Sequence, residues 1–378
     1  MLILAAILAI FVYGIIAAMF GTIIPALAKQ FALSNSQAGF IFTAQALGLT
    51  IASVSVGPLI DNKGKKVGLL LGLGLVAVAL YGLANATGYE MTVACAVILG
   101  IGGGIIVTGA NTLVSDINPE KRGSVMNFLN LFFGLGGLVT PLLASDLLGG
   151  DAVKLAYFAA ALTTITLAVH VMTKMPAPTG GSAAGAGQMG ALLKQPVLYM
   201  LALFLFLYVA CEMGVWNWLV KHLIAQGLPE PTALRILSLG FALGILLGRV
   251  AVAPVLIKVP AATVTLASAA MMAVTTYAML QTNDPTSAGI AVFLAGIAMA
   301  PVFPTTLAMV GGAFPQATGT AMGIVITSGW IGLLVSSPII GSVAGSSGLR
   351  TALLLLPAFS VLMVIVNLVM RPMLKKAA

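Results

Sequence analysis

Glu212 is an acidic residue near the middle of an apolar stretch, from Leu198 to Val220, that is long enough to cross a membrane. A charged side chain at that depth costs about 2.5–3.5 kcal/mol on insertion scales. Such residues contact a substrate, carry a proton or balance a buried charge. The chemistry expected of Glu212 is therefore the handling of a proton or a solute.

Tyr208, Glu212 and Trp216 share one face of this helix because they are spaced four residues apart, and Asn217 lies one step around. A carboxylate, an amide and flat aromatic rings suit a hydroxyl-rich ring, since polar groups bond its hydroxyls and an indole stacks on its apolar face. The alternative is that the aromatic residues pack against neighbouring helices or form an interfacial belt. Trp218, near the outer end, fits the belt.

Arg249 is a basic residue inside another apolar stretch, and it needs an acceptor. The candidates are Glu212, a helix C-terminus and backbone carbonyls. A pair with Glu212 would be structural, or a switch that a proton breaks. An unpaired Glu212 would be desolvated and able to exchange a proton near neutral pH. The position of Arg249, toward the cytoplasmic half of its helix, argues against direct contact.

Other polar residues inside apolar stretches are further candidates for solute binding. Asn127 and Asn130 precede small residues on one stripe, which suits either a cavity lining or contact between two helices. Trp330 offers a second stacking surface. The remaining candidates are Gln45 and Asn111.

The elements that hold these residues are apolar helices. Of the 378 residues, 60% are hydrophobic and 7% are charged, against about 25% charged in soluble domains. Apolar stretches of membrane-spanning length recur throughout, which predicts an all-α integral membrane protein. Its twelve transmembrane helices are expected at 2–26, 36–60, 67–87, 90–114, 123–148, 152–174, 196–222, 233–257, 260–281, 286–310, 317–344 and 349–370. The first is read as a transmembrane helix, not a signal peptide.

Basic residues concentrate in every second connection and in the C-terminal tail, which predicts that both termini lie in the cytoplasm. The membrane is expected to be the inner or plasma membrane. The net charge of +8 forms no patch, so no nucleic-acid partner is expected. The basic residues in these connections and in the tail are Lys63, Lys65, Lys66, Lys121, Arg122, Lys174, Lys194, Lys258, Arg371, Lys375 and Lys376.

The chain is predicted to consist of two six-helix bundles, at 1–175 and 196–378, joined by a flexible cytoplasmic linker at 176–195 that is rich in Gly, Ser and Ala. A shift of 196 residues superposes parts of the two halves. The superposed pairs are Gly100 with Gly296, Pro119 with Pro315, and Gly123 with Gly319. Transporters built from such repeats bind substrate near the membrane midplane.

The connection between the second and third predicted helices carries a motif. Gly57, Asp61, Gly64, Lys65 and Lys66 occur in the order Gly-Pro-Leu-Ile-Asp-Asn-Lys-Gly-Lys-Lys. The motif resembles the loop signature of the major facilitator superfamily, except that Asn replaces the usual Arg after the Asp.

The resemblance implies a gate, in which Asp61 interacts with the positive N-terminal end of a helix in the other half and holds the cytoplasmic side shut. Gly57 would permit close helix packing, Gly64 a tight turn, and both Lys65 and Lys66 would face the cytoplasm. The alternative is a positively charged loop without a gate.

Four further segments, at 109–116, 122–141, 248–249 and 300–305, resemble the sugar-transporting branch around the fucose and glucose/proton symporters. The fucose symporter carries acids in its first and fourth helices, whereas this chain has none in the interior of either. Its coupling scheme is therefore not transferred.

The prediction is a monomeric secondary transporter in a lipid bilayer that moves a small polar solute, with a monosaccharide as the favoured class, together with protons by alternating access. The alternatives are efflux of amphipathic drugs or metabolites, which 18 Met residues suit, a sugar uniporter without coupling, and a receptor. An enzyme is not expected, since no Ser/His, paired-acid or metal pattern occurs. His170, His222, Cys95 and Cys211 are isolated, so no metal or cofactor is expected.

Overall fold

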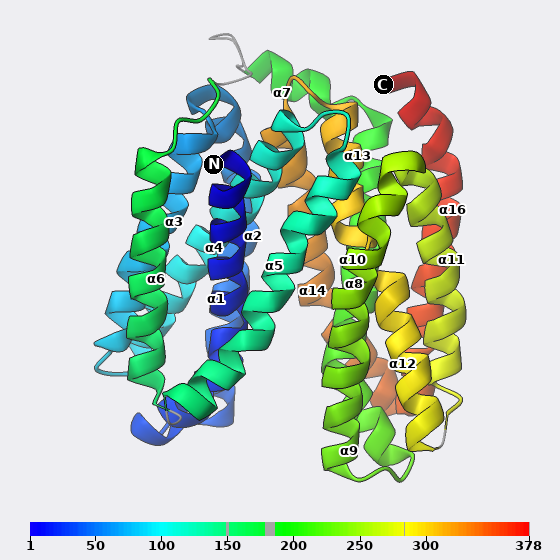
Figure 1. Cartoon of the computed structure of the whole chain (residues 1–378). Coiled ribbons are helices and arrows are strands. Elements are labelled where there is room, and N and C mark those ends of the chain that lie inside the picture. The colour runs from blue at the N-terminus through cyan, green and yellow to red at the C-terminus, as the bar shows by residue number, and fades with distance from the viewer. Residues whose placement is uncertain (149–150, 178–185, 283, 378) are drawn as a thin grey trace. The chain divides into compact units, whose positions relative to one another are not determined.

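Helices joined by short connections make up the residues that the computed structural model describes, which are 1–148, 151–177, 186–282 and 284–377 (Figure 1). Twelve of its helical spans are long and apolar enough to cross a membrane. The predicted all-α fold with twelve transmembrane helices is thereby confirmed. The chain divides into two compact units, which are described separately.

Unit 1 comprises residues 1–117, 129–192 and 315–327. Helix α4 is its centre, because α1, α2 and α3 all pack on it, and α6 covers α1 and α3. Its elements are α1 (Leu2–Gln30), α2 (Asn35–Lys63), α3 (Lys65–Ala84), α4 (Tyr89–Ile117), most of α5 (Arg122–Leu142), the π-helical turn η1 (Leu143–Leu147), α6 (Ala152–Met172), α7 (Ala186–Leu193) and the first turns of α14 (Thr318–Ser347).

Unit 2 comprises residues 118–128, 193–314 and 328–378. Helix α16 packs on α8 and α11, and α12 packs on η2, α10 and α11. Its elements are α8 (Pro196–Ala225), α9 (Glu230–Arg235), the π-helical segment η2 (Ile236–Ala242), α10 (Leu243–Lys258), α11 (Ala261–Met279), α12 (Pro285–Met299), α13 (Val302–Ala313), the rest of α14, α15 (Leu349–Leu353) and α16 (Leu355–Ala377).

Several predicted helices are less regular than expected. The helix predicted at 233–257 contains the π-helical segment η2, and the helix predicted at 286–310 is interrupted between α12 and α13. The predicted linker at 176–195 is partly helical, because α7 occupies residues 186–193, while residues 178–185 lie outside the described part of the chain. The π-helical turn η1 likewise ends the helix predicted at 123–148.

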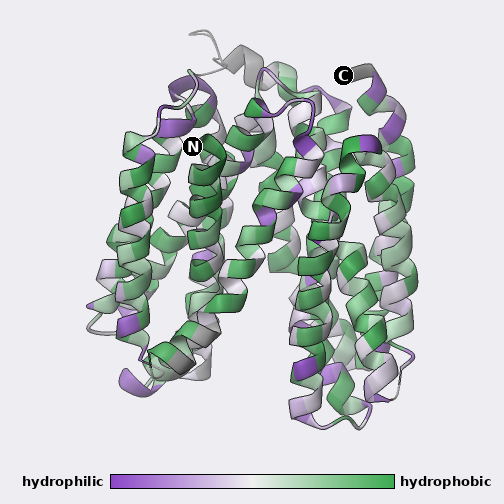
Figure 2. Ribbon diagram, in the orientation of Figure 1, coloured by the Kyte–Doolittle hydropathy of each residue, from purple (hydrophilic) through white to green (hydrophobic). Residues whose placement is uncertain are grey.

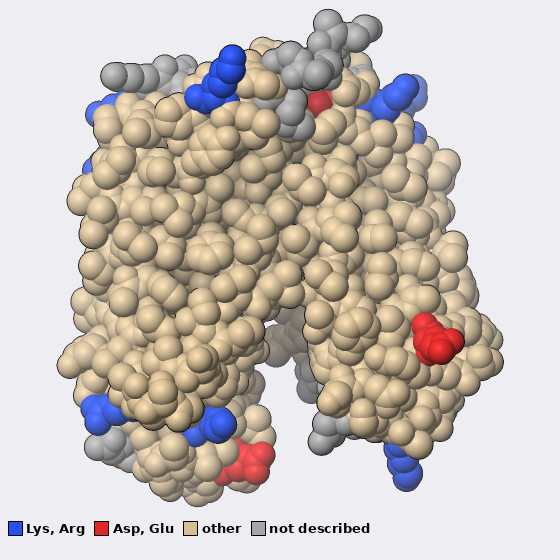
Figure 3. All heavy atoms as spheres, turned by 180° about the vertical axis from the view of Figure 1, so that it is seen from behind, with Lys and Arg blue, Asp and Glu red and all other residues tan. Residues whose placement is uncertain are grey.

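The hydropathy of the residues changes along the axes of the helices. Hydrophobic residues line the length of the helices and hydrophilic residues gather toward the connections (Figure 2). On the face drawn in Figure 3, charged side chains lie mainly toward the helix ends, and a wide band between them is uncharged. This distribution is the one that a hydrocarbon layer selects.

Glycines set the distance between helices in unit 1. A Cβ on Gly100 would lie 2.0 Å from the carbonyl oxygen of Gln45, and a Cβ on Gly48 would lie 2.3 Å from that of Val97. The backbones of α2 and α4 therefore touch at this crossing. Close approach through small residues is the usual packing mode in lipid, where no hydrophobic effect drives helices together.

The three glycines 102–104 of α4 face three different helices. A Cβ would lie 2.6 Å from Val76 of α3 at Gly102, 2.5 Å from Tyr13 of α1 at Gly103, and 2.6 Å from the Leu49 carbonyl oxygen of α2 at Gly104. The run permits close helix approach on three sides, as a glycine run inside an apolar helix predicts.

The crossing of α2 and α4 recurs in unit 2. The shift of 196 residues carries Gly48 and Gly100 onto Gly244 and Gly296. A Cβ on Gly244 would lie 2.4 Å from the Phe293 carbonyl oxygen, and a Cβ on Gly296 would lie 2.4 Å from that of Phe241. Corresponding helices of the two units therefore cross at corresponding glycines.

Gly100→Ala is expected to destabilise the protein by about 1–3 kcal/mol, because the added methyl overlaps a backbone carbonyl that cannot move away. Gly74→Ala in α3 is the matched control, since nothing lies within 4 Å of its Cβ position. That variant should be neutral or gain about 0.5–1 kcal/mol. Thermal unfolding in detergent measures both, and equal midpoints would contradict the packing described.

Candidate functional site

The predicted face of α8 is present in unit 2. The ring of Tyr208 is fully buried, Glu212 and Trp216 are partly buried, and the Trp216 ring meets Phe241 of η2 edge-on at a centroid distance of 5.2 Å. The hydroxyl of Tyr208 is buried and has no hydrogen-bond partner among the described residues. A buried hydroxyl without a partner is costly, so this face holds unused hydrogen-bonding capacity.

Arg249 of α10 lies within electrostatic reach of Glu212. Within the described part of the chain, however, Glu212 forms no ion pair at 4.0 Å or less. Arg249 is 6% exposed, and its Nε donates a hydrogen bond of 3.3 Å to the carbonyl oxygen of Ala300. A backbone carbonyl is thus one of the acceptors that the sequence predicts for this arginine.

Three further residues singled out in the sequence, Asn217, Trp330 and Trp218, also belong to unit 2. Asn217 is exposed and donates to the Ser337 hydroxyl at 2.8 Å. The ring of Trp330 on α14 lies 6.4 Å from that of Phe303. Trp218 carries the Lys221 ammonium 5.4 Å above its ring, an arrangement consistent with its predicted place in an interfacial belt.

The amides predicted in unit 1 are mostly engaged with one another. Asn130 donates to the Oδ1 of Asn111 at 2.9 Å, and Asn111 donates to the Val107 carbonyl oxygen at 2.8 Å. Both asparagines are buried. Gln45 is partly buried, and its amide has no hydrogen-bond partner within the described residues. Among the predicted amides of unit 1, which are Gln45, Asn111 and Asn130, Gln45 is therefore the one that no other described residue engages.

Asn127 does not join the Asn111–Asn130 pair. Its Nδ2 donates to the Gly123 carbonyl oxygen at 2.8 Å and to the Thr305 hydroxyl of α13 at 2.9 Å, within unit 2. The stripe predicted on one face of α5 therefore divides, because α5 is shared between the units after Phe128.

Asp61 lies at the N-terminus of α14, within unit 1. Its carboxylate accepts hydrogen bonds from the Gly319 amide at 2.9 Å, the Thr320 amide at 2.8 Å and the Thr320 hydroxyl at 2.6 Å. A Cβ on Gly57 would lie 2.5 Å from the Cα of Thr320, so a glycine is required for this approach. A carboxylate that binds free amides at the positive end of a helix is a strong contact.

The basic residues of the same loop are less exposed than predicted. Gly64 makes the tight turn, with a φ of 94°. Lys65 is 1% exposed and pairs with Asp116 of α4 at 2.7 Å, and Lys66 donates to the Val171 carbonyl oxygen at 2.7 Å. The expectation that Lys65 faces the cytoplasm is wrong, because the partly buried carboxylate of Asp116 on a neighbouring helix draws the ammonium inward.

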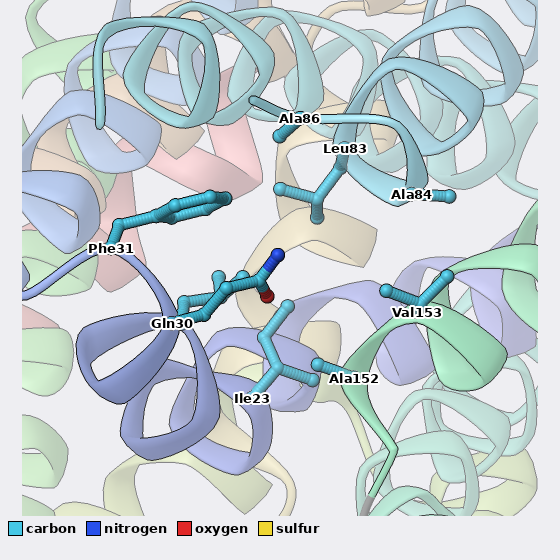
Figure 4. Close-up of a pocket in the computed structure, with 9 residues that line it drawn as sticks. Ile23, Gln30, Phe31, Leu83, Ala84, Ala86, Ala152 and Val153 are labelled. Atoms are coloured by element: carbon cyan, nitrogen blue, oxygen red, sulfur yellow. The ribbon is translucent and has the colours of Figure 1, made fainter. Parts of the chain in front are cut away.

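A cavity elsewhere in unit 1 does not serve as a solute site. It lies between the end of α1, the connection after α3 and the start of α6 (Figure 4). Its volume is about 10 Å³, which is room for about one water molecule. A monosaccharide does not fit there.

Sequence reasoning missed the partners of the predicted residues. These are Phe241 beside Trp216, Thr305 beside Asn127, Asp116 beside Lys65, Ala300 beside Arg249, and Thr320 with Gly319 around Asp61. One signal pointed to the last pair, since the repeat places Gly319 at the start of a helix, as it does Gly123.

These observations define the class of protein as a multi-pass helical membrane protein with polar side chains held inside its apolar helices. The family model described as Major Facilitator Superfamily matches residues 6–253. The chain belongs to the major facilitator superfamily.

Solved structures support the same fold. The Escherichia coli fucose:proton symporter FucP, in a crystal structure of the outward conformation, has a TM-score of 0.86 and 19% identity. The match covers 97% of this chain and 98% of FucP. At this identity the likeness shows the fold alone.

The names of the relatives indicate different transported solutes. The glucose/mannose transporter GlcP of Bacillus subtilis is 25% identical over 349 residues, which cover 88% of this chain and 85% of GlcP. The 4-hydroxybenzoate transporter PcaK of Pseudomonas aeruginosa is 27% identical over 180 residues, which cover 46% of this chain. The chain spans 39% of the length of PcaK and 55% of that of Bypass of stop codon protein 6 of Saccharomyces cerevisiae.

Proposed function

We propose that this transporter moves a monosaccharide together with protons by alternating access, and that both termini are cytoplasmic. The observation that carries the proposal is the α8 face, which combines the Glu212 carboxylate with the unpartnered Tyr208 hydroxyl and the Trp216 ring. A sugar needs hydrogen-bonding groups for its hydroxyls and an aromatic surface for its apolar face.

Glu212 is proposed to take up the transported proton. The ionised carboxylate is poorly solvated at this depth, and protonation removes that cost. The neutral carboxyl group then donates one hydrogen bond to the solute and accepts another. Solute and proton would therefore bind best together, which is the requirement for coupling.

Asp61 is proposed to hold the cytoplasmic side shut through its three hydrogen bonds to the start of α14. Opening of that side would require these bonds to break. Because the contact is charge-assisted, it stabilises the state in which the cytoplasmic side is closed relative to the state in which that side is open.

The names of FucP and GlcP include the monosaccharides fucose, glucose and mannose, which supports a monosaccharide as the solute. The second candidate is an amphipathic or aromatic solute, which the name of PcaK and the edge-on Trp216–Phe241 pair favour. Such a solute would insert between the two rings and would need few hydrogen bonds.

A panel of hexoses and 4-hydroxybenzoate, tested for thermal stabilisation of the purified protein, separates the two candidates. A ligand that binds the folded state raises the unfolding midpoint. We expect a hexose to do so, and Trp216→Leu to weaken its binding by about tenfold, while Trp216→Phe keeps most of it. Trp218→Phe is the control. Stabilisation by 4-hydroxybenzoate alone would favour the second candidate.

A further inference from the structure

Phe241 is the aromatic partner of Trp216, and it comes from a different element of unit 2. The two ring centroids lie 5.2 Å apart at an interplanar angle of 74°, which is the edge-to-face geometry that aromatic pairs prefer. Phe241 is fully buried, whereas Trp216 is partly exposed. The phenyl ring therefore covers the buried side of the indole, and the exposed part of the indole lies away from it.

The backbone of Phe241 is held at the crossing with α12. A Cβ on Gly296 would lie 2.4 Å from the Phe241 carbonyl oxygen, and a Cβ on Gly244 would lie 2.4 Å from that of Phe293. The two backbones therefore touch on both sides of the crossing. Because a close-packed backbone contact leaves no room for a shift, the phenyl ring has a fixed base from which it reaches Trp216.

Phe241 also belongs to the π-helical segment η2, which contacts both α12 and α8. A π-helix bonds residue i to residue i+5, so its side chains follow a different angular spacing from those of an α-helix. Short π-helical segments are rare and occur frequently at functional sites. The segment that carries the partner of Trp216 is thus the irregular part of its span.

Unit 1 has the same crossing with a different side chain. The shift of 196 residues places Gln45 of α2 at the position of Phe241. A Cβ on Gly100 would lie 2.0 Å from the Gln45 carbonyl oxygen, so the backbone contact is the same. Residues 40–46, which correspond to η2, lie within the α-helix α2. The crossing itself therefore requires neither an aromatic ring nor a π-helical turn.

We propose that Phe241 is a positioning residue that holds the Trp216 indole in place and thereby favours a solute that stacks on one ring. Since Phe241 covers the buried side of the indole, a solute reaches it from the exposed side. A pyranose ring needs one such surface, because polar groups bind the hydroxyls at its edge. An aromatic solute between the two rings would have to separate the pair. This inference rests on the role proposed above for Trp216 in solute binding.

The contact can be tested without a solute. Trp218 and Trp330 are the other two of the three tryptophans, so Trp218→Phe/Trp330→Phe leaves Trp216 as the one indole. In this full-length background in detergent, Phe241→Leu should lower the fluorescence anisotropy of Trp216 and raise its quenching by acrylamide, because the indole gains rotamer freedom. Phe241→Met fills the vacated space more readily and should act in the same direction.

Phe204→Leu is the matched control. Phe204 is also fully buried and lies on α8 itself, where the helix rises about 18 Å from Phe204 to Trp216. The variant loses the same ring from the same unit and should leave the Trp216 signal unchanged. Anisotropy and quenching that stay unchanged in both Phe241 variants, or that change equally in Phe204→Leu, would overturn the positioning role.

Solute binding by the protein with all three tryptophans tests the consequence. Phe241→Leu should weaken binding of the hexose found by thermal stabilisation about three- to tenfold, which corresponds to one aromatic pair. Phe204→Leu should not weaken it. The effect of Phe241→Leu should vanish in Trp216→Leu, since Phe241 acts through that ring.

Two results would overturn the preference for a solute that stacks on one ring. One is a loss of hexose binding that persists in Trp216→Leu/Phe241→Leu relative to Trp216→Leu. The other is binding of 4-hydroxybenzoate that Phe241→Leu abolishes, because that solute would then lie between the rings. A panel in which no hexose binds would instead overturn the proposed solute, whereas the fluorescence of Trp216 would still decide whether Phe241 positions it.

Discussion

Glu212→Gln is expected to abolish uphill uptake while sparing exchange of solute across the membrane. Glutamine keeps the size and hydrogen-bonding capacity of the neutral carboxyl group, but it cannot release a proton. The loaded carrier should still reorient. Proteoliposomes with an imposed pH gradient measure the first property, and counterflow of the hexose found by thermal stabilisation measures the second.

The size of the effect follows from the gradient. One pH unit supplies about 1.4 kcal/mol per proton, which supports about tenfold accumulation for one proton per solute. The variant should equilibrate without accumulation. Glu230→Gln, at the exposed start of α9, is the matched control and should behave as the unmodified protein does. Uphill uptake that persists in Glu212→Gln would exclude this residue as the proton carrier.

Asp61→Asn is expected to loosen the start of α14. The substitution removes the charge from three hydrogen bonds and replaces one acceptor oxygen by a donor that faces an amide. Hydrogen bonds to charged groups contribute about 1.5–3 kcal/mol, so a loss of about 2 kcal/mol, or roughly 30-fold in the equilibrium, is expected. Hydrogen–deuterium exchange of the Gly319 and Thr320 amides should accelerate accordingly.

Thr320 provides graded controls for the same contact. Thr320→Val keeps the shape and the amide but removes the hydroxyl that donates to Asp61, so its effect should be smaller. Thr320→Ser keeps all three donors and should change exchange least. Equal protection of these amides in Asp61→Asn and the unmodified protein would show that the contact does not hold the helix.

The helices could be predicted because membrane-spanning length and apolar composition are local properties of the sequence. The break between α12 and α13 also has a local cause in the sequence, since Pro301 and Pro304 lie at it. Hydropathy nevertheless predicts one continuous helix there, because the apolar run continues across the prolines and hydropathy alone does not detect a missing N–H.

The site could be predicted where it lies on one helix. The face of Tyr208, Glu212 and Trp216 follows from spacing, and their partners do not, since Phe241 and Arg249 come from elements that only packing brings near. The burial of Lys65 could not be predicted for the same reason, because its partner Asp116 lies on another helix. The asparagines of α5 diverge because that helix is shared by two units, which no local pattern reveals.

The most direct test of the central claim is to record the proton and the solute together. Proteoliposomes that contain the unmodified protein are given a hexose on one side, and the external pH is followed without an imposed gradient. Coupled transport predicts hexose-dependent proton entry, seen as external alkalinisation, that Glu212→Gln removes. Hexose entry without any proton movement would contradict proton coupling and leave a uniporter.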